Sequence, residues 1–194
     1  HEVERARAEA VGRAGEGPGQ EFAHAVCGKV GSAPAPCTTP EELPPLPQWG
    51  RLRQAEAEFR RVNFAATLLA GEEALVYTIG SALRADVSGP GYWVFSRARL
   101  ADGSVVAVNR GFVPGSRRDA GTRPEGQMEG AVAITGALRW PDPTGAFTPA
   151  ADAAANIWFS RDPVAIAAAK GMAAVAPFYI EQESPVPAGG SPRS

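Results

Sequence analysis

One hairpin signal does most to restrict what this chain can fold into. The segments Tyr92–Leu100 and Ser104–Asn109 are rich in aromatic and β-branched residues, and Asp102 and Gly103 lie between them. An Asp-Gly pair between two such runs is typical of a tight β-hairpin, because glycine readily adopts the positive φ that the turn needs. We therefore expect two antiparallel strands joined by a turn at Asp102 and Gly103.

The rest of the chain also reads mainly as strands. Apolar and polar residues alternate along 59–69, which is typical of a half-buried strand preceded by a short helical segment. Further strands are expected at 74–79, 131–140 and 175–181, and Ser88–Gly91 is expected to form a turn. The fold class that follows is mainly β (α+β), as a small antiparallel β-barrel or a strongly curved sheet with a few short helices.

One helix has clear end signals. Asp162 is a natural N-cap, Pro163 fits the first helical position, and Lys170 with Gly171 marks the C-terminal end. We expect a helix between these residues.

Composition divides the chain into three parts. Residues 1–47 combine a helix-forming stretch with a proline-rich connector, and residues 184–194 form a tail rich in proline and glycine. Between them, residues 48–183 carry the predicted strands. We expect a single β-rich domain over 48–183.

Charge and composition exclude several classes of protein. The 194 residues have a net charge of -2, which provides no electrostatic surface for nucleic acid. Two histidines and two cysteines are too few for most metal centres, so no metal site is expected. No run of about 20 apolar residues is present, so no membrane span is expected within this sequence.

The two cysteines leave three possibilities open. Cys27 and Cys37 could form a disulfide, remain free thiols, or join His24 in a metal site. A structural zinc site needs four ligands, which favours the disulfide over a metal.

The sequence shows few residues that could carry out catalysis. Both histidines precede the predicted domain, so no histidine is available as a base beside a nucleophile within it. Glu72 and Glu73 lie on a predicted turn, where charged side chains are usually solvated. We expect a protein that is not an enzyme.

Aromatic and arginine side chains around the hairpin are the best candidates for a binding site. Alternation along the strand directs Tyr92 and Val94 to one face and Trp93 and Phe95 to the other, so both faces should be covered. These aromatic residues either complete the core or contribute to a partner surface, where aromatic residues and arginine predominate. The candidate contact residues are Tyr92, Trp93, Asn109, Arg110, Arg117 and Arg118, and the candidate turn residues are Gly91, Asp102, Gly103 and Gly111.

A collinear series of motifs resembles a known family. The series comprises Glu58–Val62 (EFRRV), Gly89–Val94 (GPGYWV), Leu100–Gly103 (LADG), Val108–Pro114 (VNRGFVP), Gly136–Arg139 (GALR), Phe147–Pro149 (FTP), Asn156–Trp158 (NIW) with Arg161 and Asp162, and Val175–Phe178 (VAPF). In order and spacing it resembles the surfeit-locus-one cytochrome c oxidase assembly factors, particularly those of α-proteobacteria. Residues 1–47, with both cysteines, match no motif of that family.

The resemblance implies a role in the respiratory chain. Members of the family are chaperones that assist haem a insertion into the catalytic subunit of haem–copper oxidase, with that subunit and haem a synthase as partners. Their soluble domain lies between two membrane helices, and in bacteria it is on the periplasmic side of the inner membrane. The histidine linked to haem a lies in the second membrane helix, so its counterpart is expected beyond Ser194 and none is assigned here.

Arg110 is the best candidate for a contact with a haem propionate or an acidic partner, since guanidinium pairs bidentately with carboxylate. For Asn109 and Gly111 the alternative is a role in turn geometry alone. The alternative function is a periplasmic β-barrel domain that binds a small ligand.

Overall fold

The computed structural model describes residues 39–69, 71–81, 84–128, 130–172 and 175–185. Cys27, Cys37 and His24, with the disulfide predicted for the cysteines, lie outside these residues. Residues Pro40–Arg193 form one compact unit, and all that follows concerns that unit. Within the described residues, no helix is both long and apolar enough to cross a membrane.

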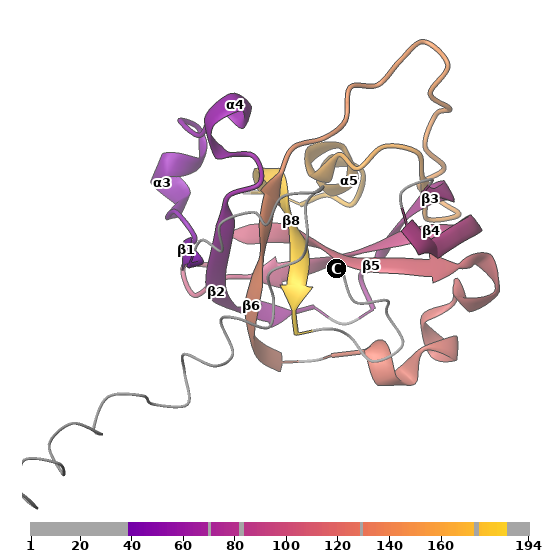
Figure 1. Ribbon diagram of the computed structural model, residues 1–194, viewed down its shortest axis with the longest axis horizontal. Coiled ribbons are helices and arrows are strands. Elements are labelled where there is room, and N and C mark those ends of the chain that lie inside the picture. Colours follow the sequence, from indigo (N-terminus) through magenta and orange to yellow (C-terminus); the bar gives the residue numbers. More distant parts are fainter. Residues whose placement is uncertain (1–38, 70, 82–83, 129, 173–174, 186–194) are drawn as a thin grey trace, which may run out of the picture. The chain divides into compact units, whose positions relative to one another are not determined.

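Over the described residues the unit is mainly β and is built on one sheet of eight strands (Figure 1). The strand order is β1-β2-β6-β8-β5-β4-β3-β7, and β2 also pairs with β4. The strands are β1 (Glu41–Glu42), β2 (Arg61–Leu68), β3 (Ala74–Ser81), β4 (Arg84–Arg99), β5 (Val105–Pro114), β6 (Gly130–Arg139), β7 (Ile157–Trp158) and β8 (Val175–Ser184). Short helices and 3-10 turns complete it: α3 (Leu46–Trp49), α4 (Gln54–Ala57), η1 (Gly115–Arg117), η2 (Ala120–Thr122), η3 (Pro124–Gly126) and α5 (Pro163–Ala169).

The sheet is mixed, which corrects the antiparallel sheet expected from the sequence. Strands β1 and β2, β3 and β7, and β5 and β8 pair in parallel. The sheet also curls, because the end of β2 pairs with β4 through Thr67 and Leu68. The pairs β5–β8 and β3–β7 join strands that are far apart in the chain. The alternation of apolar and polar residues predicts that a segment is a strand, but it does not predict which strand pairs with it or in which direction.

The predicted hairpin is confirmed. Strands β4 and β5 pair antiparallel, and Gly103 has a φ of 84° in the turn between them. The Asp102 carboxylate accepts a hydrogen bond from the Ser104 amide at 2.9 Å, which fixes the turn locally.

The turn predicted at Ser88–Gly91 is wrong, because β4 runs through these residues. Gly89 has a φ of 75°, and the register with β3 shifts between Thr78 and Gly80, so the glycine accompanies a β-bulge rather than a chain reversal. Gly91 is a strand residue paired with Thr78 and Pro114. A Cβ atom there would lie 2.4 Å from the Val113 carbonyl oxygen, so only glycine fits this close approach.

Both faces of the hairpin are covered, as the alternation predicts. On one face Val94 and Val113 pack with Leu75, and Tyr92 adjoins them. On the other, Phe95 belongs to a second cluster that includes Tyr179, with the rings 5.1 Å apart, and Trp93 adjoins it. The largest cluster joins β2, β6 and β8 to α3 and includes Trp49, Val62, Ile134, Leu138 and Phe178.

Helix α5 forms where its end signals predict. The Asp162 carboxylate accepts hydrogen bonds from the amides of Val164 and Ala165 at 2.9 and 3.1 Å. Gly171 has a φ of 67° just after the helix, as expected for a C-terminal glycine. The helix buries Ile166 and Ala167 against the sheet.

Candidate functional site

A buried glutamate organises the region beside the hairpin. Glu73 precedes β3, and its side chain is only 11% exposed. Its carboxylate accepts hydrogen bonds from both Nη atoms of Arg123, at 2.7 and 3.4 Å, and from Nε2 of Gln127 at 3.3 Å. Burial of this charge is tolerable because arginine supplies the matching geometry of two parallel donors.

Arg110 is the second arginine facing Glu73. Its Nη1 lies 4.0 Å from Glu73 Oε1, and its Nη2 donates to the Gly126 carbonyl oxygen. Burial lowers the pKa of Arg110, the Glu73 charge raises it, and the nearby Arg123 lowers it again. Arg110 Nε has no hydrogen-bond partner among the described residues. The guanidinium therefore faces the interior of the domain.

Arg123 also holds together the loop that follows β5. Its Nε donates to the Arg117 carbonyl oxygen at 2.8 Å, and its Nη2 reaches the Arg118 carbonyl oxygen at 3.3 Å. These contacts connect the 3-10 turns η1, η2 and η3 to Glu73. The position of Arg117 and Arg118 therefore depends on the buried ion pair.

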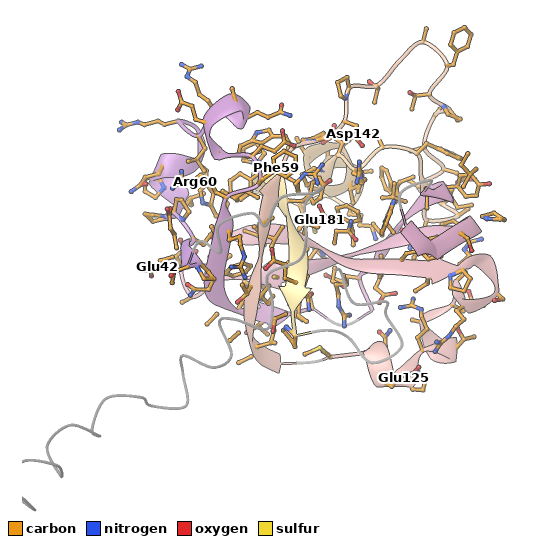
Figure 2. All side chains as sticks on the ribbon, in the orientation of Figure 1. Glu42, Phe59, Arg60, Glu125, Asp142 and Glu181 are labelled. Carbon is orange, nitrogen blue, oxygen red and sulfur yellow. The ribbon has the colours of Figure 1, made fainter. Side chains whose placement is uncertain are left out.

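Arg117 and Arg118 form the outer part of this region. Arg117 pairs with Glu125 and donates to the Thr122 carbonyl oxygen at 3.2 Å, with its side chain 35% exposed. Figure 2 shows Glu125 at the outer edge of the 3-10 turns. Hydrogen bonding by the Glu125 amide, and then by Arg117, lowers the pKa of the Glu125 carboxyl.

Arg118 contacts an aromatic ring, whereas Arg117 contacts a carboxylate. Its guanidinium carbon lies 5.6 Å from the centre of the Tyr92 ring, which is a cation–π geometry, and its Nη2 donates to the Ala155 carbonyl oxygen. We call the set Arg110, Arg117, Arg118 and Arg123 with Glu73 and Glu125 the arginine cluster. Arg110 and Arg123 face Glu73, and Arg117 pairs with Glu125. The cluster therefore holds four guanidinium groups and two carboxylates.

The structure brings together four of the six candidate contact residues: Tyr92, Arg110, Arg117 and Arg118. Trp93 lies on the opposite face, with its ring 5.8 Å from that of Phe112. Asn109 is fully buried, and its Oδ1 accepts a hydrogen bond from the Gly111 amide at 3.1 Å. Gly111 has a φ of 123° within β5, where the register with β4 shifts, so it belongs to a bulge and not to a turn.

Glu73 and Arg123 are the residues that sequence reasoning missed. Glu73 was expected on a turn with a solvated side chain, and that expectation is wrong, since its carboxylate is largely buried. No local signal could have identified the pair, because the two residues are 50 positions apart.

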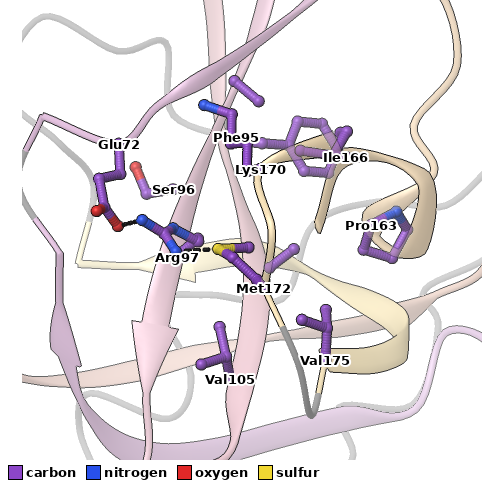
Figure 3. A pocket seen from close by; sticks show the side chains of 12 residues that line it. Glu72, Phe95, Ser96, Arg97, Val105, Pro163, Ile166, Lys170, Met172 and Val175 are labelled. Atoms are coloured by element: carbon purple, nitrogen blue, oxygen red, sulfur yellow. Dashed lines mark hydrogen bonds and ion pairs between the residues drawn. The ribbon is translucent and has the colours of Figure 1, made fainter. Parts of the chain in front are cut away.

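A small cavity elsewhere in the domain offers no ligand site. It has a volume of about 20 Å³ and lies between Phe95, Ile166 and Arg97 (Figure 3). The Arg97 guanidinium lies between the Glu72 carboxylate and the Met172 sulfur. Burial, and then the charge of Arg99, lowers the pKa of Arg97. A volume of this size holds about one water molecule.

The side chains of the described residues restrict which metal or haem sites this domain can form. Among the residues that the structure describes, no group of three or more His, Cys, Asp or Glu side chains is arranged to hold a metal ion. Histidine, cysteine and methionine are common axial ligands of haem, and only Met128 and Met172 fall among the described residues. Met128 packs against the main core, and Met172 contacts Arg97. The described residues therefore fit a carboxylate contact better than axial ligation.

The fold and the cluster define a mainly β domain with an internal glutamate–arginine network below a partly exposed arginine surface. A family model described as the SURF1 family matches residues 28–193. The chain belongs to this family.

Curated relatives agree with this assignment. A SURF1-like protein of Drosophila melanogaster is 31% identical over 153 residues, which cover 73% of this chain and 48% of that protein. A SURF1-like protein of Monosiga brevicollis is 36% identical over 56% of this chain and 44% of its own length. Surfeit locus protein 1 of Homo sapiens is 36% identical over 45% of this chain and 29% of its own length. The chain thus spans less than half the length of these relatives, which are eukaryotic, and the α-proteobacterial type stays a prediction.

Proposed function

We propose that this domain is part of a non-catalytic assembly factor for haem–copper cytochrome c oxidase, which assists haem a insertion into the catalytic subunit. Membership of the SURF1 family over residues 28–193 carries the proposal. The motif series from Glu58 to Phe178 lies within this match. The full protein would be anchored in the bacterial inner membrane, with this domain on the periplasmic side and with the catalytic subunit and haem a synthase as partners.

The arginine cluster is the part of the domain suited to this role. Arg117 and Arg118 lie at or near the surface, and Tyr92 lies below Arg118. A carboxylate, whether a haem propionate or an acidic side chain of the catalytic subunit, is the group that such guanidinium donors bind best. Arg110 lies behind them and would act by holding the loop through Gly126.

Haem a would be ligated outside the described residues. Its propionates could pair with Arg117 and Arg118, whereas the two described methionines are engaged elsewhere. When bound, haem a supplies the redox group of the oxidase, and this domain would only orient it or protect its acceptor.

Complementation of a deletion strain tests the proposal. The variant Arg117→Glu/Arg118→Glu should produce oxidase with a reduced haem a absorption band, because the like charges repel a carboxylate partner. Arg51→Glu, at an exposed position after α3, is the control and should restore the band fully. A normal haem a band with the double variant, at normal protein level, would refute the role of the cluster.

Haem titration of the purified chain separates a direct haem site from a partner contact. We expect weak binding without a histidine-type Soret spectrum. Tight, saturable binding with such a spectrum would contradict this assignment and point to His24.

A further inference from the structure

One edge of the sheet is open next to the short strand β7. Strand β3 pairs with β4 on one side, and on the other side β7 covers only Leu75 and Val76. Within the described residues, Tyr77, Thr78 and Ile79 have no strand partner on that side. The side chain of Ile79 is 78% exposed, and that of Tyr77 is 37% exposed.

This edge lacks two of the usual protections against strand addition. Exposed edges are normally blocked by charged side chains, proline or bulges. At the other end of the sheet, β1 carries the exposed residues Glu41 and Glu42. The segment Tyr77–Ile79 has no charge and no proline. The bulge shared with β4 lies between Thr78 and Gly80, and the Gly80 amide donates to Thr78 Oγ1 at 3.3 Å.

A hollow adjoins the open edge. It has a volume of about 340 Å³ and is lined by Tyr77, Thr78 and Trp93 of the sheet, by Phe159–Arg161 after β7, and by residues of the loop Asp142–Thr148. The rings of Tyr77 and Phe159 lie 6.0 Å apart. Because side chains alternate along a strand, a segment added beside Tyr77–Ile79 directs every second side chain toward one face, where the hollow can accept it.

The charged groups at the hollow favour a basic neighbour. Arg161 Nε donates to Asp142 Oδ2 at 3.0 Å, and the Asp142 side chain is 56% exposed against 22% for Arg161. Figure 2 shows Asp142 at the base of its loop, away from Glu125 and the 3-10 turns. A cation from a partner can therefore reach the carboxylate more easily than an anion can reach the guanidinium.

We propose that the open edge of β3 and this hollow bind an extended segment of a partner protein, by strand addition. The segment would place an aromatic or aliphatic side chain in the hollow and a lysine or arginine near Asp142. The open backbone edge is complementary to another polypeptide backbone, and β7 already binds the adjoining residues of the same edge in this way.

A short segment fits this surface better than a second copy of the domain. The open edge is about 10 Å long, whereas a stable interface between folded proteins buries about 1,200 Å² or more. The edge adjoins the arginine cluster, since the Tyr77 ring lies 5.8 Å from that of Tyr92, over which Arg118 lies. The inference does not rest on the proposed oxidase role, because it is argued from the backbone edge and the hollow alone.

Selection from a phage library of random peptides of about twelve residues, with the full 194-residue chain as bait, tests the proposal. The selected peptides should share an apolar residue and a nearby basic residue. Amide chemical shifts of the chain should change at Tyr77–Gly80 and Phe159–Arg161 when a selected peptide is added.

Two variants make the test specific. Ile79→Lys, which blocks the edge with a charge at an exposed position, should weaken peptide binding about tenfold or more. Leu46→Lys, at an exposed apolar position on α3, is the matched control and should leave the affinity unchanged. Asp142→Lys should weaken binding of the peptides that carry the basic residue.

Several results would overturn the proposal. Failure to select any binder, shifts that map elsewhere, or equal affinity of the folded Ile79→Lys variant would each contradict strand addition. Concentration-dependent dimerisation that Ile79→Lys abolishes would assign the edge to a second copy instead.

Discussion

Glu73 Oε2 lies 2.7 Å from Nη2 of Arg123, and both side chains are almost completely buried. This pair connects the start of β3 to the loop after β5, and through that loop it positions Arg117 and Arg118. The surface suited to a carboxylate partner is therefore supported by an ion pair that the partner does not touch.

The Glu73 carboxylate is expected to be essential for stability. Glu73→Gln would leave Arg110 and Arg123 buried without a counter-charge, and removing one partner of a buried pair costs about 3–5 kcal/mol of unfolding free energy. Urea unfolding measures this loss. Glu125→Gln, which removes the exposed partner of Arg117, is the control and should change the midpoint little. Equal midpoints for the two variants would contradict the structural role of Glu73.

Gly91 is expected to tolerate no side chain. In Gly91→Ala the new methyl group would lie 2.4 Å from the Val113 carbonyl oxygen and 2.5 Å from the Phe112 ring, so strands β4 and β5 must separate. We expect a loss of about 3 kcal/mol in thermal or urea unfolding. Gly121→Ala meets no atom within 4 Å and should be almost neutral. A neutral Gly91→Ala variant would show that the strands can adjust.

The hairpin turn should respond to pH through Asp102. The hydrogen bond from the Ser104 hydroxyl, and then that from the Ser104 amide, lowers the pKa of Asp102 below its usual value of 3.8. The folded state therefore prefers the ionised carboxyl, so its contribution to stability is present above pH 3.8 and is lost as the pH falls through the lower folded-state pKa. Ser104→Ala should raise the pKa of Asp102, measured by carboxyl ¹³C NMR titration. Ser116→Ala, at an exposed position, should leave it unchanged.

The N-cap of α5 should contribute measurable stability. Asp162→Ala removes the acceptor for the amides of Val164 and Ala165 and should cost about 1 kcal/mol in urea unfolding. Asp162→Asn keeps an acceptor oxygen and should retain most of this stability. A loss as large for asparagine as for alanine would assign the effect to the charge of Asp162.

Features with local causes were predictable from the sequence. The hairpin turn depends on Asp102, Gly103 and Ser104, which are neighbours in the chain, and the cap of α5 depends on residues within one helical turn. The alternation through Tyr92, Trp93 and Phe95 assigned these side chains to the correct faces. The turn predicted at Gly91 was wrong because a glycine also serves close packing of strands, and the sequence does not distinguish the two uses.

The candidate site was only partly predictable. Tyr92, Arg110, Arg117 and Arg118 were identified as aromatic and basic residues near one hairpin, and the structure brings them together. It also turns Arg110 inward, places Trp93 on the other face and adds Glu73 and Arg123. These arrangements follow from contacts between distant segments.

The sequence by itself therefore determined the β-rich class, the β4–β5 hairpin, the ends of α5 and the motif series of the family. Only the tertiary structure decided the mixed strand order, the open edge at Ile79 and the burial of Glu73 between two arginines. The physical reason is the range of the interactions. Turns and caps are stabilised by hydrogen bonds between near neighbours, whereas strand pairing and buried ion pairs form only when the chain brings remote residues together.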